Sequence, residues 1–408
     1  MKFYTKLNQL DPSISVVEKK KNLLIKKIVN FLYFHGPKSA VDISKKLKSS
    51  IPTITSIIVE LTETGMISEQ GQGNSSGGRR PVLYGLKNDS LFILGIDIGK
   101  HDTRMAIYNT NFEEVTELKS YPLGLVNDEM VLNEIIKLVQ NLIEESKINR
   151  DKIIGIGIGM PGLVDSDQGR NLTYFHQKKG SLAELLSEKF AIPVFIENDA
   201  KTRALAEFRF GRAKGKQNVL VILVDWGVGL GIIINGKLCR GKSGFAGEFS
   251  HIPMEENGKL CMCGKQGCLE TVASGSALVN MAAEGLANGQ KSILSGMLTN
   301  QSKELELKMI IDAADMGDQF AISIISKLGL ELGKGIAILI QLFNPELIIL
   351  GGRVAEANQY LLTPIQQSLN HYCIKQLREQ AEIVISEFGS NTNILGAVAM
   401  VVENIFEK

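Results

Sequence analysis

Three cysteines and one histidine lie close together near the middle of the chain. Cys261 and Cys263 are separated by one residue, and Cys268 follows across a glycine-containing loop. His251 comes from the preceding segment. One imidazole and three thiolates form a closed tetrahedral ligand set, which fits a structural zinc ion and leaves no position for an activated water. The alternative is three unrelated thiols in a loop, but the spacing favours zinc.

The cellular compartment decides how clustered cysteines are interpreted. The first six residues, Met1 to Lys6, have no apolar core typical of a signal peptide. The sequence has no apolar run of the roughly 20 residues that a membrane-spanning helix needs. We therefore expect a cytoplasmic protein without a membrane partner, in which clustered cysteines bind metal rather than form disulfides. Cys239 and Cys373 are isolated, and we expect them to pack in the interior.

Composition and charge indicate two kinds of structure in one chain. The 408 residues are 44% hydrophobic and include 40 glycines, which is typical of α/β proteins with many tight turns. Residues 1–87 hold 14 Lys and Arg against 6 Asp and Glu, a net charge of +8, so the remainder carries −7. A basic segment joined to an acidic body favours nucleic-acid binding, although a solvated, lysine-rich helix face would have the same charge.

The basic segment has the pattern of a small helical domain. After a tail over residues 1–18, apolar residues recur at helical spacing from Lys19 to about Gly36. Ser39 is placed to cap a helix over 40–47, and Ser50-Ile51-Pro52 opens a third helix that Gly65 ends. Strand-like runs follow at 66–70 and 82–86. Three helices and a hairpin predict a winged helix-turn-helix domain over residues 1–87.

The rest of the chain alternates strand and helix patterns. A buried strand that ends in a glycine turn occurs twice, as Ile96-Asp97-Ile98-Gly99 and as Val224-Asp225-Trp226-Gly227. Two related α/β lobes around a cleft would explain this doubling. We expect a first lobe over 88–200, with a C-terminal helix at 390–408 packing back on it, and a second lobe over 201–389. The expected strands are 104–109, 153–159, 193–197, 219–224, 230–235, 347–350 and 382–386, and the expected helices are 127–146, 181–189, 200–209, 274–286, 304–315, 318–342, 355–370 and 391–406.

These motifs together resemble the signature of the ROK family, which contains sugar kinases, sugar-responsive repressors and uncharacterised relatives. The resemblance covers nearly the whole chain. It rests on the His/Cys stretch and on four further segments: Met160-Pro161-Gly162-Leu163-Val164-Asp165, Ile196-Glu197-Asn198-Asp199-Ala200, Asp225-Trp226-Gly227-Val228-Gly229-Leu230-Gly231 and Ser76-Gly77-Gly78-Arg79-Arg80-Pro81. The resemblance implies a duplicated actin-like (ribonuclease H-like) sugar kinase fold behind the DNA-binding head.

The resemblance also implies a sugar site. Sugars present hydroxyls in pairs, which carboxylates and carboxamides bind through two hydrogen bonds. Glu248 and Glu270 flank the zinc motif, so folding of that loop around zinc would position both. His251 would then use one ring nitrogen for zinc and the other for a sugar hydroxyl. Taken singly, each carboxylate could be an ordinary surface charge. As a set, the residues that match the family's sugar-binding positions are Asn198, Asp199, Glu248, His251 and Glu270.

Two departures from the kinase pattern argue against phosphoryl transfer. Asp199 stands at the position of the kinases' general base, so it would be catalytic if the chain were a kinase. At the first glycine turn, however, Lys100 and His101 replace the glycine and threonine of the kinase pattern. At the second turn, Asp225 and Val228 replace two threonines, and a carboxylate facing a polyphosphate is repulsive. Compensation by the lysine is the alternative, but we expect no productive ATP binding and no catalytic residue.

The third helix of the head carries short hydroxyl residues that could contact DNA. Residues of this type reach base edges or phosphates in the major groove, and wing arginines next to glycines can approach a minor groove. A winged helix used for protein contact is the alternative, which the charge of +8 disfavours. The predicted DNA-binding residues are Ser49, Ser50, Thr53, Thr55, Ser56, Arg79 and Arg80.

The sequence therefore predicts a sugar-responsive transcription factor that represses its targets. We expect a homodimer or homotetramer, because paired heads match a pseudopalindromic double-stranded operator. Two alternatives remain open: an ATP-dependent sugar kinase that carries a DNA-binding head, and a repressor controlled by a partner protein. The pattern does not identify the sugar, and the segment 171–177, which includes His176, is a candidate for discriminating between sugars.

Overall fold

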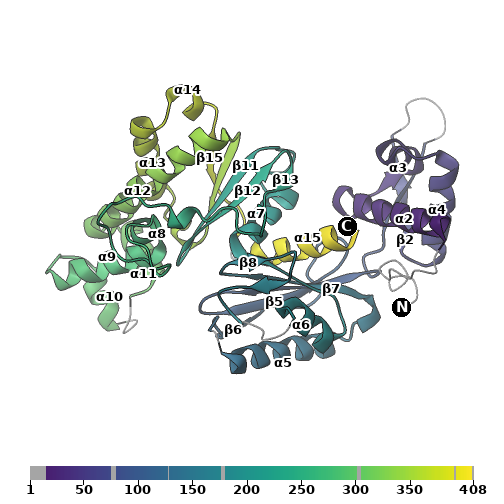
Figure 1. Ribbon diagram of the computed structural model, residues 1–408, viewed down its shortest axis with the longest axis horizontal. Coiled ribbons are helices and arrows are strands. Elements are labelled where there is room, and N and C mark those ends of the chain that lie inside the picture. The colour runs from purple at the N-terminus through teal and green to yellow at the C-terminus, as the bar shows by residue number, and fades with distance from the viewer. Residues whose placement is uncertain are drawn as a thin grey trace. The chain divides into compact units, whose positions relative to one another are not determined.

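The computed structural model describes residues 15–74, 80–126, 128–175, 180–300, 305–389 and 392–406 (Figure 1). Internal contacts divide them into two units. One contains the residues up to Asn198 together with those from Ile394 onward, and the other contains Asp199–Asn393. The boundaries expected at residues 87 and 200 stay predictions. In the part of the chain that the structure describes, no helix is long and apolar enough to cross a membrane.

The head has three helices, α2 (Val16–His35), α3 (Ala40–Leu47) and α4 (Ile51–Glu63). A three-stranded sheet with the order β1-β3-β2 completes the winged helix-turn-helix that was predicted. Its strands are β1 (Lys38–Ser39), β2 (Ile67–Gln72) and β3 (Val82–Leu86). The two-residue strand β1 was not predicted, because it is too short to leave an alternating pattern.

The helix ends of the head follow from their capping residues. Ser39 forms a capping box with Asp42, and Ser50 accepts a hydrogen bond from the Thr53 amide, as predicted for the starts of α3 and α4. Helix α2 begins three residues earlier than Lys19, because the Ser15 side chain accepts the Glu18 amide. The predicted tail is therefore too long at its end, while its residues 1–14 lie outside the described residues.

The first α/β sheet has five strands in the order β10-β7-β4-β5-β6. Helices α5 (Glu129–Glu145) and α6 (Leu182–Phe190) cover one face, and α15 (Thr392–Phe406) covers the other (Figure 1). The central strand β4 is buried on both faces, as expected for a doubly covered sheet, and its one charged residue is Asp97. The strands are β4 (Phe92–Ile98), β5 (Thr103–Tyr108), β6 (Lys119–Tyr121), β7 (Ile153–Met160) and β10 (Val194–Asn198), with a separate ribbon of β8 (Val164–Asp165) and β9 (Arg170–Asn171).

Glycines in this sheet make room for α15. A Cβ added to Gly157 would lie 2.2 Å from the Ala397 carbonyl oxygen, and one added to Gly155 would lie 2.5 Å from Val401. A Cβ on Gly95 would lie 2.6 Å from Ile394. No side chain fits at these distances, so the helix packs directly on bare strand backbone.

The second sheet repeats the topology of the first. Its order is β13-β12-β11-β14-β15, with β11–β12 and β12–β13 antiparallel and β11–β14 and β14–β15 parallel. The first sheet has the same directions in the same order, starting from β4. The duplicated fold predicted from the two glycine turns is thus confirmed. The strands are β11 (Val219–Val224), β12 (Val228–Ile234), β13 (Lys237–Leu238), β14 (Leu347–Gly351) and β15 (Glu382–Ile385).

Helices cover both faces of this second sheet. Strand β11 alternates, because Val219 and Val221 face the core beside α7 (Asp199–Phe210), and Leu220, Ile222 and Val224 face the larger helical core. The remaining helices are α8 (Glu270–Ala273), α9 (Gly275–Ala287), α10 (Leu294–Asn300), α11 (Leu307–Asp315), α12 (Gln319–Phe343), α13 (Gln359–Tyr372) and α14 (Lys375–Arg378), with short 3₁₀ turns η1 (Arg150–Lys152), η2 (Phe249–His251) and η3 (Arg353–Ala357).

One predicted helix is wrong in its extent. The pattern over 355–370 predicted a single helix, but the chain forms η3 and then α13. Asn358, with a φ of 47°, separates them in the left-handed region that asparagine tolerates.

Candidate metal centre and the residues around it

The predicted zinc ligands converge on one point. The ligand atoms of His251, Cys261, Cys263 and Cys268 all lie within 4.8 Å of one another. His251 Nδ1 is 3.7 Å from Cys261 Sγ, and the Sγ atoms of Cys263 and Cys268 are 3.6 Å apart. Tetrahedral zinc with Zn–S bonds of about 2.3 Å places its sulfur ligands roughly 3.8 Å apart. The cluster could therefore hold a metal ion of this size.

Backbone contacts shape the loop that carries the cluster. The Cys261 amide donates to the Lys265 carbonyl at 2.8 Å, and the Gly264 amide donates back to the Cys261 carbonyl at 2.9 Å. Gly267, with a φ of 74°, accepts the amides of Met254 and Glu255 at 2.7 and 3.2 Å. A Cβ on Gly267 would lie 1.7 Å from the Glu255 carbonyl oxygen, so this position requires glycine.

The thiols differ in how readily they ionise. Burial raises the pKa of the Cys268 thiol to about 12 and also raises the pKa of Cys261. The Lys265 backbone amide holds the pKa of the exposed Cys263 below its ordinary value. Burial thus favours the protonated thiols of Cys261 and Cys268, whereas a coordinated divalent metal deprotonates thiols outright.

Two carboxylates lie beside the cluster. Glu248 immediately precedes η2, and its Oε2 is 3.9 Å from His251 Nε2, the ring nitrogen turned away from the cysteines. Burial and the charge of Glu270 raise the pKa of Glu248, against the opposing charges of His251 and Lys201. Glu270 begins α8, and its Oε2 lies 3.0 Å from the position a Cβ would take on Gly227 of the second glycine turn.

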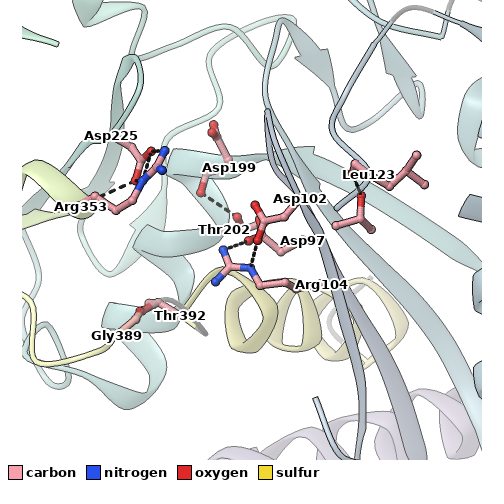
Figure 2. A network of polar contacts seen from close by, with 11 residues as sticks. Asp97, Asp102, Arg104, Leu123, Asp199, Thr202, Asp225, Arg353, Gly389 and Thr392 are labelled. Atoms are coloured by element: carbon pink, nitrogen blue, oxygen red, sulfur yellow. Dashed lines mark hydrogen bonds and ion pairs between the residues drawn. The ribbon is translucent and has the colours of Figure 1, made fainter. Parts of the chain in front are cut away.

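The other two predicted sugar-binding residues are at the junction of β10 and α7. Asn198 ends β10 in the first unit and donates through Nδ2 to the Gly162 carbonyl at 3.2 Å. Asp199 begins α7 in the second unit; its Oδ1 accepts the Ala200 amide at 2.9 Å and its carbonyl accepts the Thr202 hydroxyl at 2.7 Å (Figure 2). The structure thus groups Glu248, His251 and Glu270, and the complete five-residue set stays a prediction.

The second glycine turn contains an ion pair that the sequence did not reveal. Asp225 follows β11, and its carboxylate accepts Arg353 Nε at 3.0 Å and 3.1 Å, one distance to each oxygen (Figure 2). The backbone amides of Trp226 and Arg353 also donate to it, at 2.8 and 3.1 Å. Burial opposes ionisation, but the hydrogen bonds and charge of Arg353 outweigh it and lower the pKa of Asp225.

The first glycine turn contains a more local pair. Asp97 and Arg104 are cross-strand neighbours on β4 and β5, and Arg104 Nη2 is 2.6 Å from Asp97 Oδ2. Arg104 Nε also lies 3.3 Å from Asp102 (Figure 2). Lys100 and His101, which replace the kinase glycine and threonine, are exposed at the tip of this turn.

Five of the predicted DNA-binding residues lie on α4 or immediately before it. Thr53, Thr55 and Ser56 are exposed on its outer face, Ser50 is exposed at its N-cap, and Ser49 is half-buried just before it. Arg80 is exposed beside the wing, whereas Arg79 lies outside the described residues. Their contact with DNA stays a prediction.

A winged helix-turn-helix joined to a duplicated kinase-like fold defines a class of DNA-binding regulators built on a sugar kinase scaffold. The ROK family model matches residues 93–404, and the chain belongs to this family.

Similar proteins include regulators that match the head as well as the body. The DNA-binding transcriptional dual regulator NagC of Escherichia coli K12 is 31% identical over 90% of this chain and 89% of its own. The xylose repressor of Bacillus subtilis is 30% identical over 94% of this chain and 95% of its own. Among solved structures, a ROK family transcriptional regulator homologous to E. coli MLC has a TM-score of 0.79 at 29% identity, covering 94% of this chain and 97% of its own.

A solved kinase matches a smaller share of the chain. The ROK family glucokinase from Streptomyces griseus, in complex with glucose and AMPPNP, has a TM-score of 0.68 at 30% identity. It is covered over 98% of its own length but matches 76% of this chain.

Proposed function

We propose that this protein is a sugar-responsive DNA-binding transcriptional regulator that represses its targets and is released from its operator by a sugar. The observation that carries the proposal is the share of this chain that each similar protein matches. Regulators similar to this chain match it over 90% and 94%, whereas the Streptomyces glucokinase matches 76%. The part that distinguishes regulators from kinases is the winged helix-turn-helix, and in this chain it is strongly basic.

The metal centre supports the sugar-binding part of the proposal. A structural zinc ion held by His251, Cys261, Cys263 and Cys268 would fix the loop between η2 and α8. Glu248 and Glu270 stand at the two ends of that loop, so one ion orders both carboxylates. Because His251 turns Nδ1 toward Cys261 and Nε2 toward Glu248, its second nitrogen is available to the sugar side. Asn198 and Asp199 complete the proposed set of sugar-binding residues.

A sugar kinase is the second candidate, because Asp199, the position of the kinases' general base, is retained. The second glycine turn argues against it, since the Asp225 carboxylate is held where a phosphate-binding turn would need donors. A coupled assay of ADP release with several hexoses and aminosugars distinguishes the two. We expect no turnover, whereas turnover that Asp199→Asn abolishes would establish the kinase.

The proposed mechanism is a population shift. Sugar binding favours one conformation of the body, and that conformation changes the spacing of the two heads in a homodimer or tetramer. Only a difference in sugar affinity between the two conformations can drive this shift. Paired heads then fit, or fail to fit, half-sites separated by one or more turns of double-stranded DNA.

Sequencing the genomic DNA bound by the full-length protein tests the proposal. We expect pseudopalindromic sites near genes of sugar uptake or breakdown, and release of that DNA by one sugar or sugar phosphate. If the protein binds no specific DNA sites, the proposal that it is a transcriptional regulator is wrong. Specific sites that no sugar releases would instead support control by a partner protein.

A variant of the wing tests the DNA contacts separately. Replacing Arg79 and Arg80 by alanine removes two positive charges, so we expect operator affinity to fall and its salt dependence to become less steep. Titrations at several salt concentrations measure both. Lys87→Ala, which removes a charge at the end of the head, is the matched control. Unchanged affinity in the arginine variant would remove the wing from the interface.

A further inference from the structure

Helix α4 of the head carries apolar groups on its solvent side. Ile51 and Val59 are 47% and 50% exposed, and Thr55, which lies between them, is also exposed. The three residues are spaced four apart, so they follow one another along one side of the helix. The residues that α4 buries in the core of the head are a different set, Ile54, Ile57, Ile58 and Leu61. The exposed apolar groups are therefore available to a partner.

Hydroxyl groups near the start of α4 are already engaged within the head. Thr55 Oγ1 donates to the Ile51 carbonyl at 2.9 Å, so its hydrogen is used, while its methyl group is not. The Ser50 and Thr53 hydroxyls form a hydrogen bond of 2.7 Å with each other, and the Thr53 amide also donates to Ser50. These hydroxyls have fewer hydrogen-bonding positions left for the edge of a base.

The first part of α4 also lacks the side chains that recognise purines through two hydrogen bonds. Arginine or lysine binds guanine in this way, and asparagine or glutamine binds adenine. Residues 51–59 include none of these four types and no acidic residue. The first charged residue of the helix is Glu60, whose carboxylate lies 2.6 Å from Lys21 Nζ of α2. Direct readout by this helix therefore has to use its apolar groups.

The position of α4 in the fold points to the bases as the partner. In a helix-turn-helix the second helix lies in the major groove, with its N-terminal residues next to the base edges. Here α4 is that helix, because it follows α3 after the turn at residues 48–50. Residues 1–87 carry a net charge of +8, which favours DNA over an apolar protein surface. Among the four bases, thymine alone presents a methyl group in the major groove.

We infer that Ile51, Thr55 and Val59 recognise thymine methyl groups in each half-site of the operator. The inference rests on the proposed function, because it requires specific binding to double-stranded DNA. It adds Ile51 and Val59 to the residues that contact DNA and gives the interface a chemical preference. The basic residues of the head hold it on the phosphates of any sequence, and contact with methyl groups selects the sequence.

Replacing thymine by uracil, one position at a time, tests the inference on a site that genomic sequencing has identified. Uracil lacks the methyl group and keeps every base-pairing atom of thymine. We expect affinity to fall about fourfold at each contacted position, which is the effect of one buried methyl group. Fluorescence anisotropy with the full-length protein at constant salt concentration measures the affinity.

Variants of α4 assign the methyl contacts to their residues. Val59→Ala removes methyl groups from an exposed position, so we expect it to bind thymine and uracil sites almost equally at the position that Val59 contacts. Thr55→Ser removes one methyl group but keeps the hydroxyl that donates to the Ile51 carbonyl, so the helix is preserved. Val41→Ala is the matched control, because Val41 is 40% exposed on α3, and we expect it to keep the full preference for thymine.

The possible results separate this inference from the proposed function. If the protein binds a specific site and no uracil lowers its affinity, the inference is wrong and the regulator stands. The inference is also wrong if uracil weakens the native protein and the variants Ile51→Ala, Thr55→Ser and Val59→Ala to the same extent, because another element then contacts the methyl groups. If the protein binds no specific DNA, the proposed function and the inference fail together.

Discussion

The two α/β lobes share one strand order, and each has one glycine turn with a carboxylate, but the two turns are stabilised differently. In the first lobe, Asp97 is 2% exposed and pairs with Arg104, its direct neighbour on the next strand. In the second lobe, Asp225 pairs with Arg353, which is 128 residues away in sequence and half-exposed. A duplicated fold can thus keep a turn carboxylate in both copies and use it once inside a sheet and once at an open edge.

The lobes also differ in the segment after their third strand. In the first lobe, β6 is followed closely by α5, which begins at Glu129. In the second lobe, β13 ends at Leu238 and α9 begins only at Gly275, and the intervening segment contains the His/Cys cluster with Glu248 and Glu270. The second lobe therefore carries a cluster that could hold a metal ion beside two carboxylates, and among the described residues the corresponding segment of the first lobe has no such cluster.

The largest expected effect comes from removing metal ligands, because only the second lobe contains the described His/Cys cluster. In a Cys261→Ser, Cys263→Ser variant, two thiolates are lost, so we expect the loss of one zinc ion per chain and of the sugar response together. The head should stay folded and bind DNA, because its core contains none of these residues. Metal analysis by mass spectrometry, sugar-dependent thermal shift and operator binding measure the three properties.

The isolated cysteines provide the control for that variant. Cys239→Ser with Cys373→Ser changes two half-buried thiols outside the cluster, and it should retain zinc. If the Cys261→Ser, Cys263→Ser protein lacks zinc but still responds to sugar, the sugar response does not depend on the metal. The prediction that the native cluster binds zinc would still stand.

Two glycines of the metal loop offer a matched comparison. Gly267→Ala would place a methyl group 1.7 Å from the Glu255 carbonyl oxygen, whereas Gly264 has nothing within 4 Å of the added Cβ. Both have positive φ, so each alanine costs about 1–2 kcal/mol of backbone strain. We expect Gly267→Ala to cost several kcal/mol more and to weaken zinc binding at least tenfold, as measured by chelator competition. Similar affinities for both variants would contradict the packing argument.

The two ion pairs should differ in their contribution to stability. Asp97→Asn leaves Arg104 largely buried with a weaker partner, and breaking such a pair costs about 3–5 kcal/mol. The more exposed pair of Asp225 should contribute about 1 kcal/mol when Asp225→Asn removes it. Urea unfolding, with hydrogen exchange to assign each loss to its lobe, measures the difference. If both variants lose the same free energy of unfolding, burial does not explain a difference between the two ion pairs.

The pH dependence of the Asp225 pair gives a smaller effect with a definite sign. The folded-state pKa of Asp225 is lowered, so ionisation stabilises the fold above the unfolded pKa of about 3.9. That contribution is lost as pH falls through the lower folded-state pKa. We expect the difference in thermal midpoint between the native protein and Asp225→Asn to be constant from pH 7 to 5 and to shrink below pH 4. If the difference in thermal midpoint instead grows on acidification, the folded-state pKa of Asp225 is raised and not lowered.

The sequence was sufficient for most elements because their patterns are local. Helix α12 shows its apolar stripe over 25 residues, and α3 and α4 are preceded by capping serines. The break at Asn358 was missed, since the apolar spacing continues across it and a left-handed asparagine leaves no periodic signal. Strands of two or three residues, such as β1 and β6, were also below what alternation can reveal.

The site was predictable where its residues are close in sequence. The His/Cys cluster lies within 18 residues, so spacing alone brought its members together. Arg353 was missed because it follows β14 whereas its partner Asp225 follows β11, far away in the sequence. A signal existed, since Gly351-Gly352-Arg353 follows a strand that the repeat would pair in parallel with β11. Finding it required the sheet order, which no local pattern supplies.

The packing of α15 on bare glycine backbone has a consequence for synthesis. Gly95, Gly155 and Gly157 leave bare backbone on the face of the first sheet that α15 covers, beside apolar side chains such as Ile93 and Ile154. During translation, all strands of the second lobe leave the ribosome before residues 394–406 do. The first lobe is synthesised earlier, but one face of its sheet stays uncovered until α15 is available. It therefore completes its folding last. A chain truncated before α15 should be recognised by chaperones or proteases through the lobe that was synthesised first.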